Sequence, residues 1–354
     1  MTDGAPRMTP LMRRAEKAAA LAVADARRRV RRGGTRPPAA VERDLPVRVV
    51  EVAVEAPDAV GLRLERRDRT DLPSWRPGAH VDVVLPSGRV RQYSLCGDPR
   101  DRSTYRIAVR RIDDGEGGSK EMHALGPGDT LVLRGPRNAF PLATAPGYLF
   151  VAGGIGITPL APMARTAAAR GVPWKMVHTG RDLASLPLSA ALLAQYPTHV
   201  QRRSDTGHGG LPSAAELLDG LVPGTAVYVC GPPAMIDLLR AAVPATTEFH
   251  SERFSPPPVR GGSPFTVRLG TDGPAVEVPA DRSALHAIRS AYPSVAYSCQ
   301  QGFCGTCHVP LLAGSTVGDT AGPGRTALCV ARASGDSGAE IVVDMPAAAR
   351  AMRR

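Results

Sequence analysis

The chain has 354 residues, with 44 Lys or Arg and 33 Asp or Glu, and a net charge of +11. This length predicts two or three domains, and a hydrophobic fraction of 43% excludes a wholly disordered chain. The sequence has no run of about 18 apolar residues, so we expect no membrane-spanning helix. Its six cysteines are too few for a disulfide scaffold of this length.

The excess positive charge lies in a basic, Arg/Ala-rich extension at residues 1–43, which has eleven Arg or Lys and four acidic residues. This extension contains no aromatic side chain that could stack on a base, so its charge does not favour nucleic acid as a partner. Five arginines follow its short apolar run, Ala18–Ala24, whereas a signal peptide carries its positive charge before that run. We therefore expect a cytoplasmic protein with a solvated, partly helical extension.

Short apolar runs separated by turn sequences begin at Leu45 and predict an antiparallel β-barrel over residues 44–143. The predicted strands are Val47–Glu55, Val81–Leu85, Val90–Leu95, Tyr105–Arg111 and Thr130–Arg134.

Residues 144–255 alternate between apolar strands and helical stretches, which predicts an α/β domain with a parallel sheet. The predicted strands are Tyr148–Ala152, Lys175–Thr179, His199–Arg202, Ala226–Cys230 and Glu248–Arg253. The predicted helices are Leu160–Arg170, Ser189–Gln195 and Ala214–Leu218.

A Pro- and Gly-rich linker at residues 256–264 leads to a third domain at residues 265–346, and residues 347–354 form a tail. Phe265–Leu269 and Ala275–Pro279 predict a hairpin. Ser283 is a candidate cap for a helix over Ala284–Ala291.

The spacing of four cysteines is the most specific signal in the sequence. Cys299, Cys304 and Cys307 follow the pattern C-x4-C-x2-C, and Cys329 follows after 21 further residues. This is the plant-type spacing of a [2Fe–2S] cluster, in which each of two irons takes two thiolates. Disulfides are disfavoured because the chain carries no secretion signal.

The loop between these cysteines also fits a cluster better than a zinc ion. Gly302 and Gly305 let the backbone wrap tightly with unusual dihedral angles. A structural zinc site usually brings two C-x2-C or C/H pairs, and here there is one pair. His308 directly follows Cys307, and adjacent residues rarely bind one metal ion together.

A glycine-rich turn joins a predicted strand to a predicted helix at Gly153, Gly154 and Gly156. Glycines at such a turn let a pyrophosphate approach the backbone and the helix N-terminus, although a bare turn also explains them. Gly231 and Pro232 form a second turn at the carboxyl edge of the same sheet, where ligands bind. The two turns together predict a dinucleotide site.

A third pattern, Arg91-Gln92-Tyr93-Ser94-Leu95, lies on a barrel strand, where alternation puts Arg91 and Tyr93 on one face and Ser94 on the other. An Arg suits a phosphate, a Tyr a flat ring, and a Ser a ring nitrogen or carbonyl. Gly118 and Ser119 precede a short helical stretch and make a phosphate nest for the same ligand. Taken alone, the strand is more simply interpreted as an ordinary edge strand.

These motifs occur in one order between Leu45 and Met345, and that order resembles the phthalate dioxygenase reductase family of the ferredoxin–NADP reductase superfamily. The resemblance implies an antiparallel β-barrel flavin domain, an α/β parallel-sheet nucleotide domain and an α+β β-grasp ferredoxin domain. Because the iron–sulfur domain comes last, it implies FMN, whereas relatives with that domain first usually use FAD.

The resemblance also implies roles for single residues, none of them a covalent catalyst. The FMN site would consist of Arg91, Tyr93, Ser94, Gly118, Ser119, Thr158 and Phe254. The NAD site would consist of Gly153, Gly154, Gly156, Cys230, Gly231 and Pro232. The cluster ligands would be Cys299, Cys304, Cys307 and Cys329.

In such a chain NAD(P)H gives a hydride to FMN, and single electrons then pass through the cluster to an external acceptor. We expect a separate oxygenase as the acceptor, a Rieske-type oxygenase first and a cytochrome P450 second. NADH is expected from the resemblance, although Arg181 would favour NADPH and Asp182 would favour NADH. The alternative is a redox-responsive binding module whose basic extension contacts a partner or nucleic acid.

The sequence departs from the family near the cluster. The loop from Cys307 to Cys329 is shorter than usual, and residues 317–320 read Val-Gly-Asp-Thr where relatives tend to carry a His-Arg-Asp-like motif. We expect this departure to reshape the surface near the cluster and to affect the choice of partner more than cluster binding.

Overall fold

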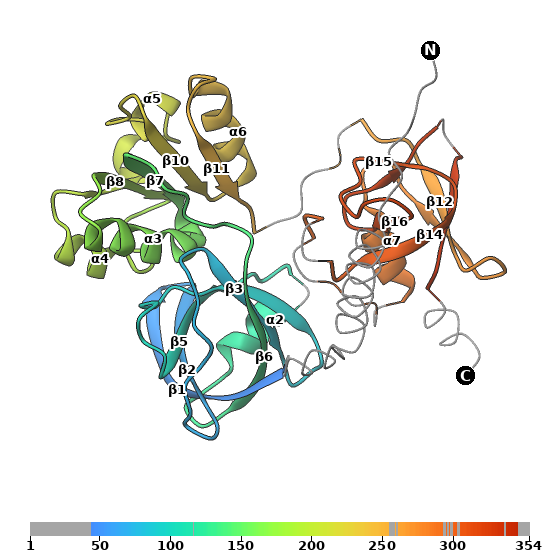
Figure 1. Ribbon diagram of the computed structural model, residues 1–354, viewed down its shortest axis with the longest axis horizontal. Helices are drawn as coiled ribbons and strands as arrows, with labels where there is room; N and C mark the ends of the chain where they lie inside the picture. Colours follow the sequence, from blue (N-terminus) through green and yellow to red (C-terminus); the bar gives the residue numbers. More distant parts are fainter. Residues whose placement is uncertain are drawn as a thin grey trace, which may run out of the picture. The chain divides into compact units, whose positions relative to one another are not determined.

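The computed structural model describes residues 44–345, except residues 116, 255–258, 260, 293–294, 296, 298–299, 303–304 and 336–337. The extension at residues 1–43 and the tail at 347–354 therefore lie outside the described residues. The described part contains one six-stranded sheet, two five-stranded sheets and a two-stranded sheet (Figure 1). None of its helices combines the length and the apolar character needed to cross a membrane.

The first sheet is antiparallel and curves into the predicted barrel. Its strands pair in the order β4-β3-β6-β1-β2-β5. The Cys96 N–H, just after β4, donates to the Arg106 carbonyl of β5 at 2.9 Å, which closes the barrel. A short helix, α2, follows β5. The elements are β1 (Asp44–Ala56), β2 (Ala59–Arg66), β3 (Ala79–Val84), β4 (Val90–Ser94), β5 (Thr104–Arg110), α2 (Gly118–His123) and β6 (Thr130–Asn138).

The second sheet is parallel, with strand order β11-β10-β7-β8-β9. Its strands are β7 (Gly147–Gly153), β8 (Trp174–Gly180), β9 (Val200–Ser204), β10 (Thr225–Cys230) and β11 (Phe249–Glu252). Its helical segments are η1 (Gly154–Gly156), α3 (Ile157–Ala169), α4 (Ser189–Gln195), η2 (Thr206–His208), α5 (Ala214–Leu217) and α6 (Pro233–Ala242).

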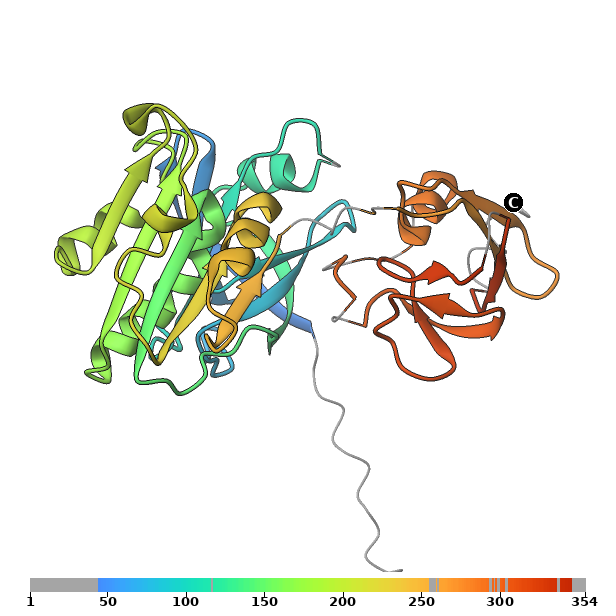
Figure 2. The ribbon, with the colours of Figure 1, turned by 90° about the horizontal axis from the view of Figure 1, so that it is seen from above.

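Helices cover both faces of this parallel sheet (Figure 2). Leu160 of α3 and Leu192 of α4 pack with Phe150 and Tyr228 on one face. Residues of α5 and α6 pack with Val151 and its neighbours on the other face. Because side chains alternate along a strand, a sheet that is covered on both faces has continuous apolar strands, as β7 and β10 do.

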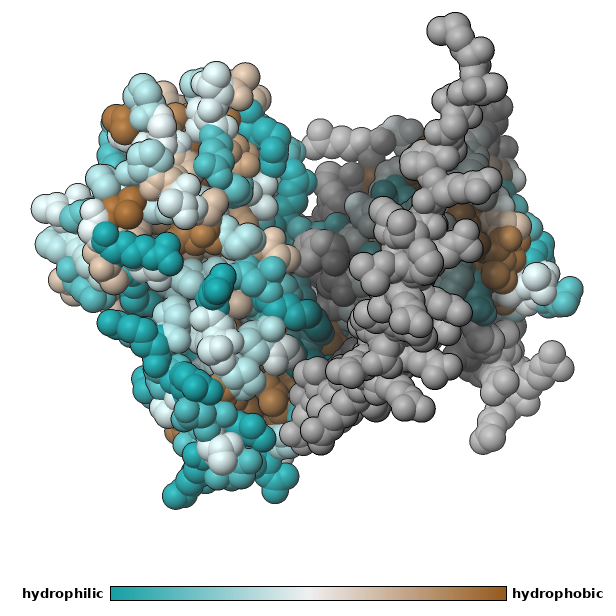
Figure 3. Space-filling model, in the orientation of Figure 1, coloured by the Kyte–Doolittle hydropathy of each residue, from teal (hydrophilic) through white to brown (hydrophobic). Residues whose placement is uncertain are grey.

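The barrel and the parallel sheet share a core. Cys96, Ala108 and Phe140 of the barrel part belong to the same buried cluster as Phe150 and Leu160. On the face drawn in Figure 3, the exposed apolar residues of these two parts are scattered among hydrophilic ones.

The C-terminal part has a mixed sheet in the order β13-β12-β18-β14-β16, in which β12 and β18 are parallel. Helix α7 contributes Leu285 and Ile288 to the core beneath this sheet. The elements are β12 (Phe265–Leu269), β13 (Ala275–Val278), α7 (Ala284–Ala291), β14 (His308–Ala313), β15 (Thr316–Val317), β16 (Arg325–Ala327), β17 (Arg332–Ala333) and β18 (Glu340–Val343).

The three-part fold class expected from the sequence is confirmed, whereas several elements were missed. The prediction omitted β2, which pairs with β1 across a two-residue turn, and it omitted all strands after α7. It also placed the helix after the glycine turn at Leu160, although α3 begins at Ile157.

Candidate functional site

The two glycine turns lie next to each other at the carboxyl edge of the parallel sheet. Strands β7 and β10 are neighbours, with Ala152 opposite Cys230. The chain proceeds from β7 to β8 and β9 on one side and then crosses to β10 and β11 on the other. This reversal between β7 and β10 is a topological switch point, where open α/β sheets bind ligands.

The turns contain glycine because their backbones pack directly against each other. A Cβ at Gly153 would lie 2.6 Å from Pro232 Cδ, and a Cβ at Gly156 would collide with the Cys230 carbonyl oxygen. A Cβ at Gly231 would lie 3.0 Å from the Gly153 backbone. The structure thus brings together five of the six residues predicted for the NAD site.

The sixth residue, Gly154, forms the open tip of the first turn. Its φ is +52°, and no atom lies within 4 Å of a Cβ built there. No side chain caps the N-terminus of α3, which begins at Ile157. Uncapped N–H groups and the helix dipole attract an anion, so the turn fits the pyrophosphate of a dinucleotide. Nearby, the buried Thr158 hydroxyl donates back to the Ile155 carbonyl at 3.0 Å.

A buried thiol and a half-buried carboxyl, whose Oε2 is shielded from water, flank the second turn. Burial raises the pKa of Cys230 well above its ordinary value, so this thiol is neutral and is not a nucleophile. Its register partner on β11 is Glu252, whose pKa burial raises to about 8. Glu252 was not among the residues predicted from the sequence. Its position two residues before Phe254 was the only signal available.

The predicted FMN residues on β4 and α2 lie against each other. A Cβ at Gly118 would lie 2.5 Å from Arg91 Nε, so a residue without a side chain is needed beside this guanidinium. Arg91 Nη1 donates to the Val90 carbonyl at 2.9 Å. The Ser119 hydroxyl accepts from the Ile112 N–H at 3.0 Å, which ties the loop after β5 to α2. A guanidinium beside a backbone without a Cβ fits a phosphate group.

The other predicted FMN residues are spread along β4 and after β11. Tyr93 and Leu95 contact the barrel core, which agrees with the alternation expected from the sequence. Burial raises the pKa of Tyr93, so its phenol is neutral. Ser94 is buried opposite His80 of β3. Phe254 is 48% exposed, and an exposed aromatic ring just after the sheet edge is free to cover a flat cofactor.

Two of the four predicted cluster ligands, Cys299 and Cys304, lie outside the described residues. The other two, Cys307 and Cys329, are buried at 5% and 4% exposure in one core. The Leu328 N–H donates to the Cys307 carbonyl at 3.3 Å, so the backbone segments that carry these two cysteines adjoin. Buried sulfurs on adjoining loops fit a cluster that the protein shields from water.

Two side chains hold the backbone of the cluster loop at Gly302. The Gly302 carbonyl accepts from Thr320 Oγ1 at 2.5 Å and from His308 Nε2 at 2.8 Å. Gly302 has φ +88°, and a Cβ there would also lie 2.8 Å from Val330 Cγ2. His308 therefore supports the loop from β14. From the sequence, His308 was considered only as a zinc ligand, and Thr320 was not among the predicted site residues.

The segment that departs from the family pattern is organised by Asp319. Its carboxylate accepts from the N–H groups of Ala321 at 2.9 Å and Ala327 at 3.0 Å, and from the Thr316 hydroxyl at 2.8 Å. Burial opposes ionisation, but the hydrogen bonds outweigh it and the pKa of Asp319 lies below its ordinary value. Asp319 thus fixes the turn that presents Thr320 to Gly302.

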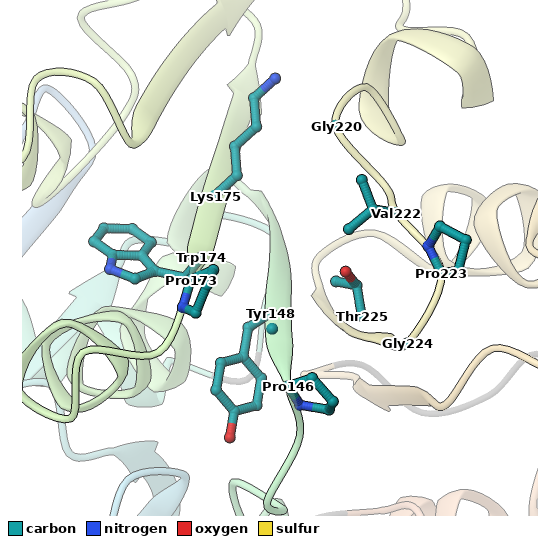
Figure 4. Close-up of a pocket in the computed structure, with 11 residues that line it drawn as sticks. Pro146, Tyr148, Pro173, Trp174, Lys175, Gly220, Val222, Pro223, Gly224 and Thr225 are labelled. Carbon is teal, nitrogen blue, oxygen red and sulfur yellow. The ribbon is translucent and has the colours of Figure 1, made fainter.

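A hollow of about 270 Å³ lies at the opposite edge of the parallel sheet (Figure 4). Tyr148, Trp174 and Thr225, from the amino ends of three strands, line it. Lys175 Nζ at this edge pairs with Asp219 at 2.6 Å. Because ligands of parallel sheets bind at the carboxyl ends, this hollow is not the coenzyme site.

Comparison with known proteins gives consistent matches. A family model described as a 2Fe-2S iron-sulfur cluster binding domain matches residues 269–334. The phthalate dioxygenase reductase of Burkholderia cepacia is 35% identical over 294 residues, covering 77% of this chain and 89% of that protein.

Two solved structures extend the match. One is titled phthalate dioxygenase reductase, a modular structure for electron transfer from pyridine nucleotides to [2Fe-2S]. It has a TM-score of 0.65 and 32% identity, and the match covers 85% of this chain and 98% of that one. The other is an intact type IV self-sufficient cytochrome P450 monooxygenase, with a TM-score of 0.65 and 33% identity over 85% of this chain and 41% of that longer chain. With this identity over most of both chains, the protein belongs to the phthalate dioxygenase reductase family.

Proposed function

We propose that this chain is the reductase component of an oxygenase system, an oxidoreductase that moves electrons from NADH through FMN and a [2Fe–2S] cluster to a separate oxygenase. One observation carries the proposal: a single chain joins the interlocked glycine turns of a dinucleotide site to the buried cysteines of a cluster domain. The solved relative titled for electron transfer from pyridine nucleotides to [2Fe-2S] supports this order of cofactors.

Bound FMN would link NADH to the cluster, because a flavin takes two electrons as a hydride and gives them up one at a time. The chain's own residues bind and orient. We assign the FMN phosphate to Arg91, Gly118 and Ser119. The FMN ring we assign to Tyr93, Ser94, Thr158 and Phe254.

The coenzyme is assigned to the turns at the switch point, with Cys230 beside its nicotinamide ring. Its pyrophosphate would lie at Gly153–Gly156 and the N-terminus of α3, and Gly231 and Pro232 would bound it on the other side. Two residues after β8 bear on the choice between NADH and NADPH. The Asp182 carboxylate, which would favour NADH, accepts from the Ser185 N–H at 2.8 Å within its own turn. Arg181, which would favour NADPH, is exposed. We keep NADH as the donor on family grounds and NADPH as the alternative.

The cluster is assigned to Cys299, Cys304, Cys307 and Cys329. A thiolate binds iron and a thiol does not, so each of these side chains must lose its proton when the cluster assembles. The hydrogen bonds to the Gly302 carbonyl would hold the loop in place for that step.

The acceptor is proposed to be a Rieske-type oxygenase first and a cytochrome P450 second. The curated relative is named for a dioxygenase, and one solved relative joins a similar reductase to a cytochrome P450 in one chain. NADH is a cytoplasmic reductant, so we propose that the protein works there. The alternative of a redox-responsive binding module depends on residues 1–43.

An anaerobic titration with NADH tests the proposal, on protein that holds FMN and the cluster. Visible absorbance should bleach at the flavin bands, and electron paramagnetic resonance should detect a reduced [2Fe–2S] cluster in the same titration. Flavin bleaching without a cluster signal would overturn the route to the cluster. If only NADPH bleaches the flavin, the coenzyme assignment is wrong.

Deletion of residues 1–43 separates the reductase from the alternative function. The truncated chain should give the same titration as the full chain, because the proposed cofactor residues all lie after residue 90. Salt-sensitive binding of nucleic acid by the full chain that is lost on truncation would favour the alternative.

A further inference from the structure

A buried histidine beneath the glycine turn has no role in the site described so far. His178 lies near the end of β8, and alternation puts it on the same face as Trp174 and Met176, which α3 covers. It is fully buried, and it lies in register with Ala152 of β7, two residues before Gly154. Strands β7 and β8 are direct neighbours (Figure 1), so His178 lies beside the strand that leads into the turn.

His178 makes one defined hydrogen bond to that turn. Its Nε2 lies 2.8 Å from the Gly154 carbonyl oxygen. A carbonyl oxygen only accepts, so Nε2 carries the proton and donates. Burial lowers the pKa of His178 to about 4, so the ring is neutral at physiological pH. Burying a polar ring costs free energy unless it is hydrogen-bonded. Gly154 satisfies Nε2, while Nδ1 is buried without a hydrogen-bond partner among the described residues.

The bond adds a second donor to one carbonyl of the turn. Gly154 has φ +52° and open space around its Cβ position, so sterics do not restrict how its peptide is oriented. Its carbonyl accepts from the Ile157 N–H within η1, and the donor on the His178 side chain reinforces that orientation from the core. In a trans peptide the carbonyl and the following N–H point in opposite directions. With the Gly154 carbonyl held by the buried His178, the N–H of Ile155 is directed away from His178.

We propose that His178 is a positioning residue for the coenzyme, because its hold on the Gly154 carbonyl presets the Ile155 N–H as a donor to the pyrophosphate. The inference rests on the proposed function for the identity of the ligand. A histidine that served only to fill the core would be replaced equally well by any side chain of similar volume. A positioning histidine requires the donor.

Two matched variants separate these roles. His178→Gln keeps an N–H donor near the place of Nε2, and His178→Leu fills the space without a donor. The probe is a tetrahydro analogue of NADH, which has no hydride to give, titrated into FMN-loaded protein and followed by the flavin difference spectrum. We expect the Kd of the analogue to rise about tenfold for His178→Leu, which corresponds to the loss of one hydrogen bond between the Ile155 N–H and the pyrophosphate. For His178→Gln it should stay within about threefold.

Steady-state reduction of ferricyanide gives a second readout. The KM for NADH should rise in parallel with the Kd, while kcat stays within about twofold, because the hydride geometry is set elsewhere. Should His178→Leu lose its FMN, His178→Asn takes its place, since its shorter side chain does not reach Gly154.

Equal binding by the wild type and His178→Leu would overturn the inference, and so would equal weakening by His178→Leu and His178→Gln. A wild-type protein that holds FMN and the cluster but does not bind the analogue would instead overturn the proposed function. The two failures are therefore distinguishable.

Discussion

Replacing Glu252 with Gln should stabilise the protein, and increasingly so as the pH rises. Glu252 ends β11 beside Cys230, and its Oε2 is buried without a hydrogen-bond partner among the described residues. Burial raises the pKa of this carboxyl from 4.5 to about 8, because the charged form loses water that Oε2 does not recover from the protein. A Gln side chain has nearly the same shape and no charge to desolvate.

The direction of the pH dependence follows from proton binding. The folded chain keeps a proton on Glu252 in a range where the unfolded chain has released it. The stabilising contribution is therefore complete below pH 4.5 and is lost as the pH rises through about 8. At about 1.36 kcal/mol per pKa unit, the full loss is about 5 kcal/mol, of which about 2 kcal/mol falls between pH 6 and pH 8.

Urea unfolding of the FMN-loaded protein at pH 6, 7 and 8, followed by FMN release, measures this effect. The free energy of unfolding of Glu252→Gln should exceed the wild-type value by about 2 kcal/mol at pH 6 and about 4 kcal/mol at pH 8. Glu51→Gln is the matched control, because Glu51 is an exposed carboxylate paired with Arg63 at 3.1 Å. Its effect should not change over this range. An advantage of Glu252→Gln that is constant from pH 6 to pH 8 would refute the reasoning.

Three further substitutions test the assigned sites. Gly118→Ala should raise the FMN dissociation constant about tenfold, because the new methyl group displaces the Arg91 side chain, 2.5 Å away; unchanged FMN affinity would argue against a phosphate site there. Cys329→Ser should abolish the cluster's paramagnetic signal while NADH still bleaches the flavin, and a persisting signal would remove Cys329 from the ligands. Thr320→Val should shorten the lifetime of the cluster in air several-fold, because the Gly302 carbonyl loses a donor, whereas Thr320→Ser should behave as wild type.

The sequence was sufficient for the fold wherever one segment carries its own signal. Five-residue segments rich in apolar residues predicted β7, β8 and β10. Ser283 marked the start of α7, where its hydroxyl accepts from the His286 N–H. β2 was missed because Gly61 interrupts its pattern and leaves only the short alternation Leu62-Arg63-Leu64-Glu65. β15 and β17 have two residues each and exist only because they pair with each other across the chain. Such strands have no local pattern to detect.

The candidate site likewise has some residues that the local sequence predicts and others that depend on strand pairing. The glycines at the switch point were predicted, because a turn that needs glycine has a composition that can be recognised locally. The bond from His178 to Gly154 joins residues on different strands, and the uncompensated burial of Glu252 depends on how β11 packs on β10. Neither follows from the neighbouring sequence, because strand register sets both.

The departure at residues 317–320 has a structural consequence beside the one expected from the sequence. We expected it to reshape the surface near the cluster and so to affect the partner. In the structure Asp319 and Thr320 are both hydrogen-bonded within the domain, to backbone groups and to the cluster loop. We therefore expect these two side chains to act on cluster stability. Val317 is 54% exposed and has no hydrogen-bonding group, so its side chain is available to a partner protein. A substitution at Val317 should change electron delivery to an oxygenase without changing cluster lifetime, and substitutions at Asp319 or Thr320 should do the reverse.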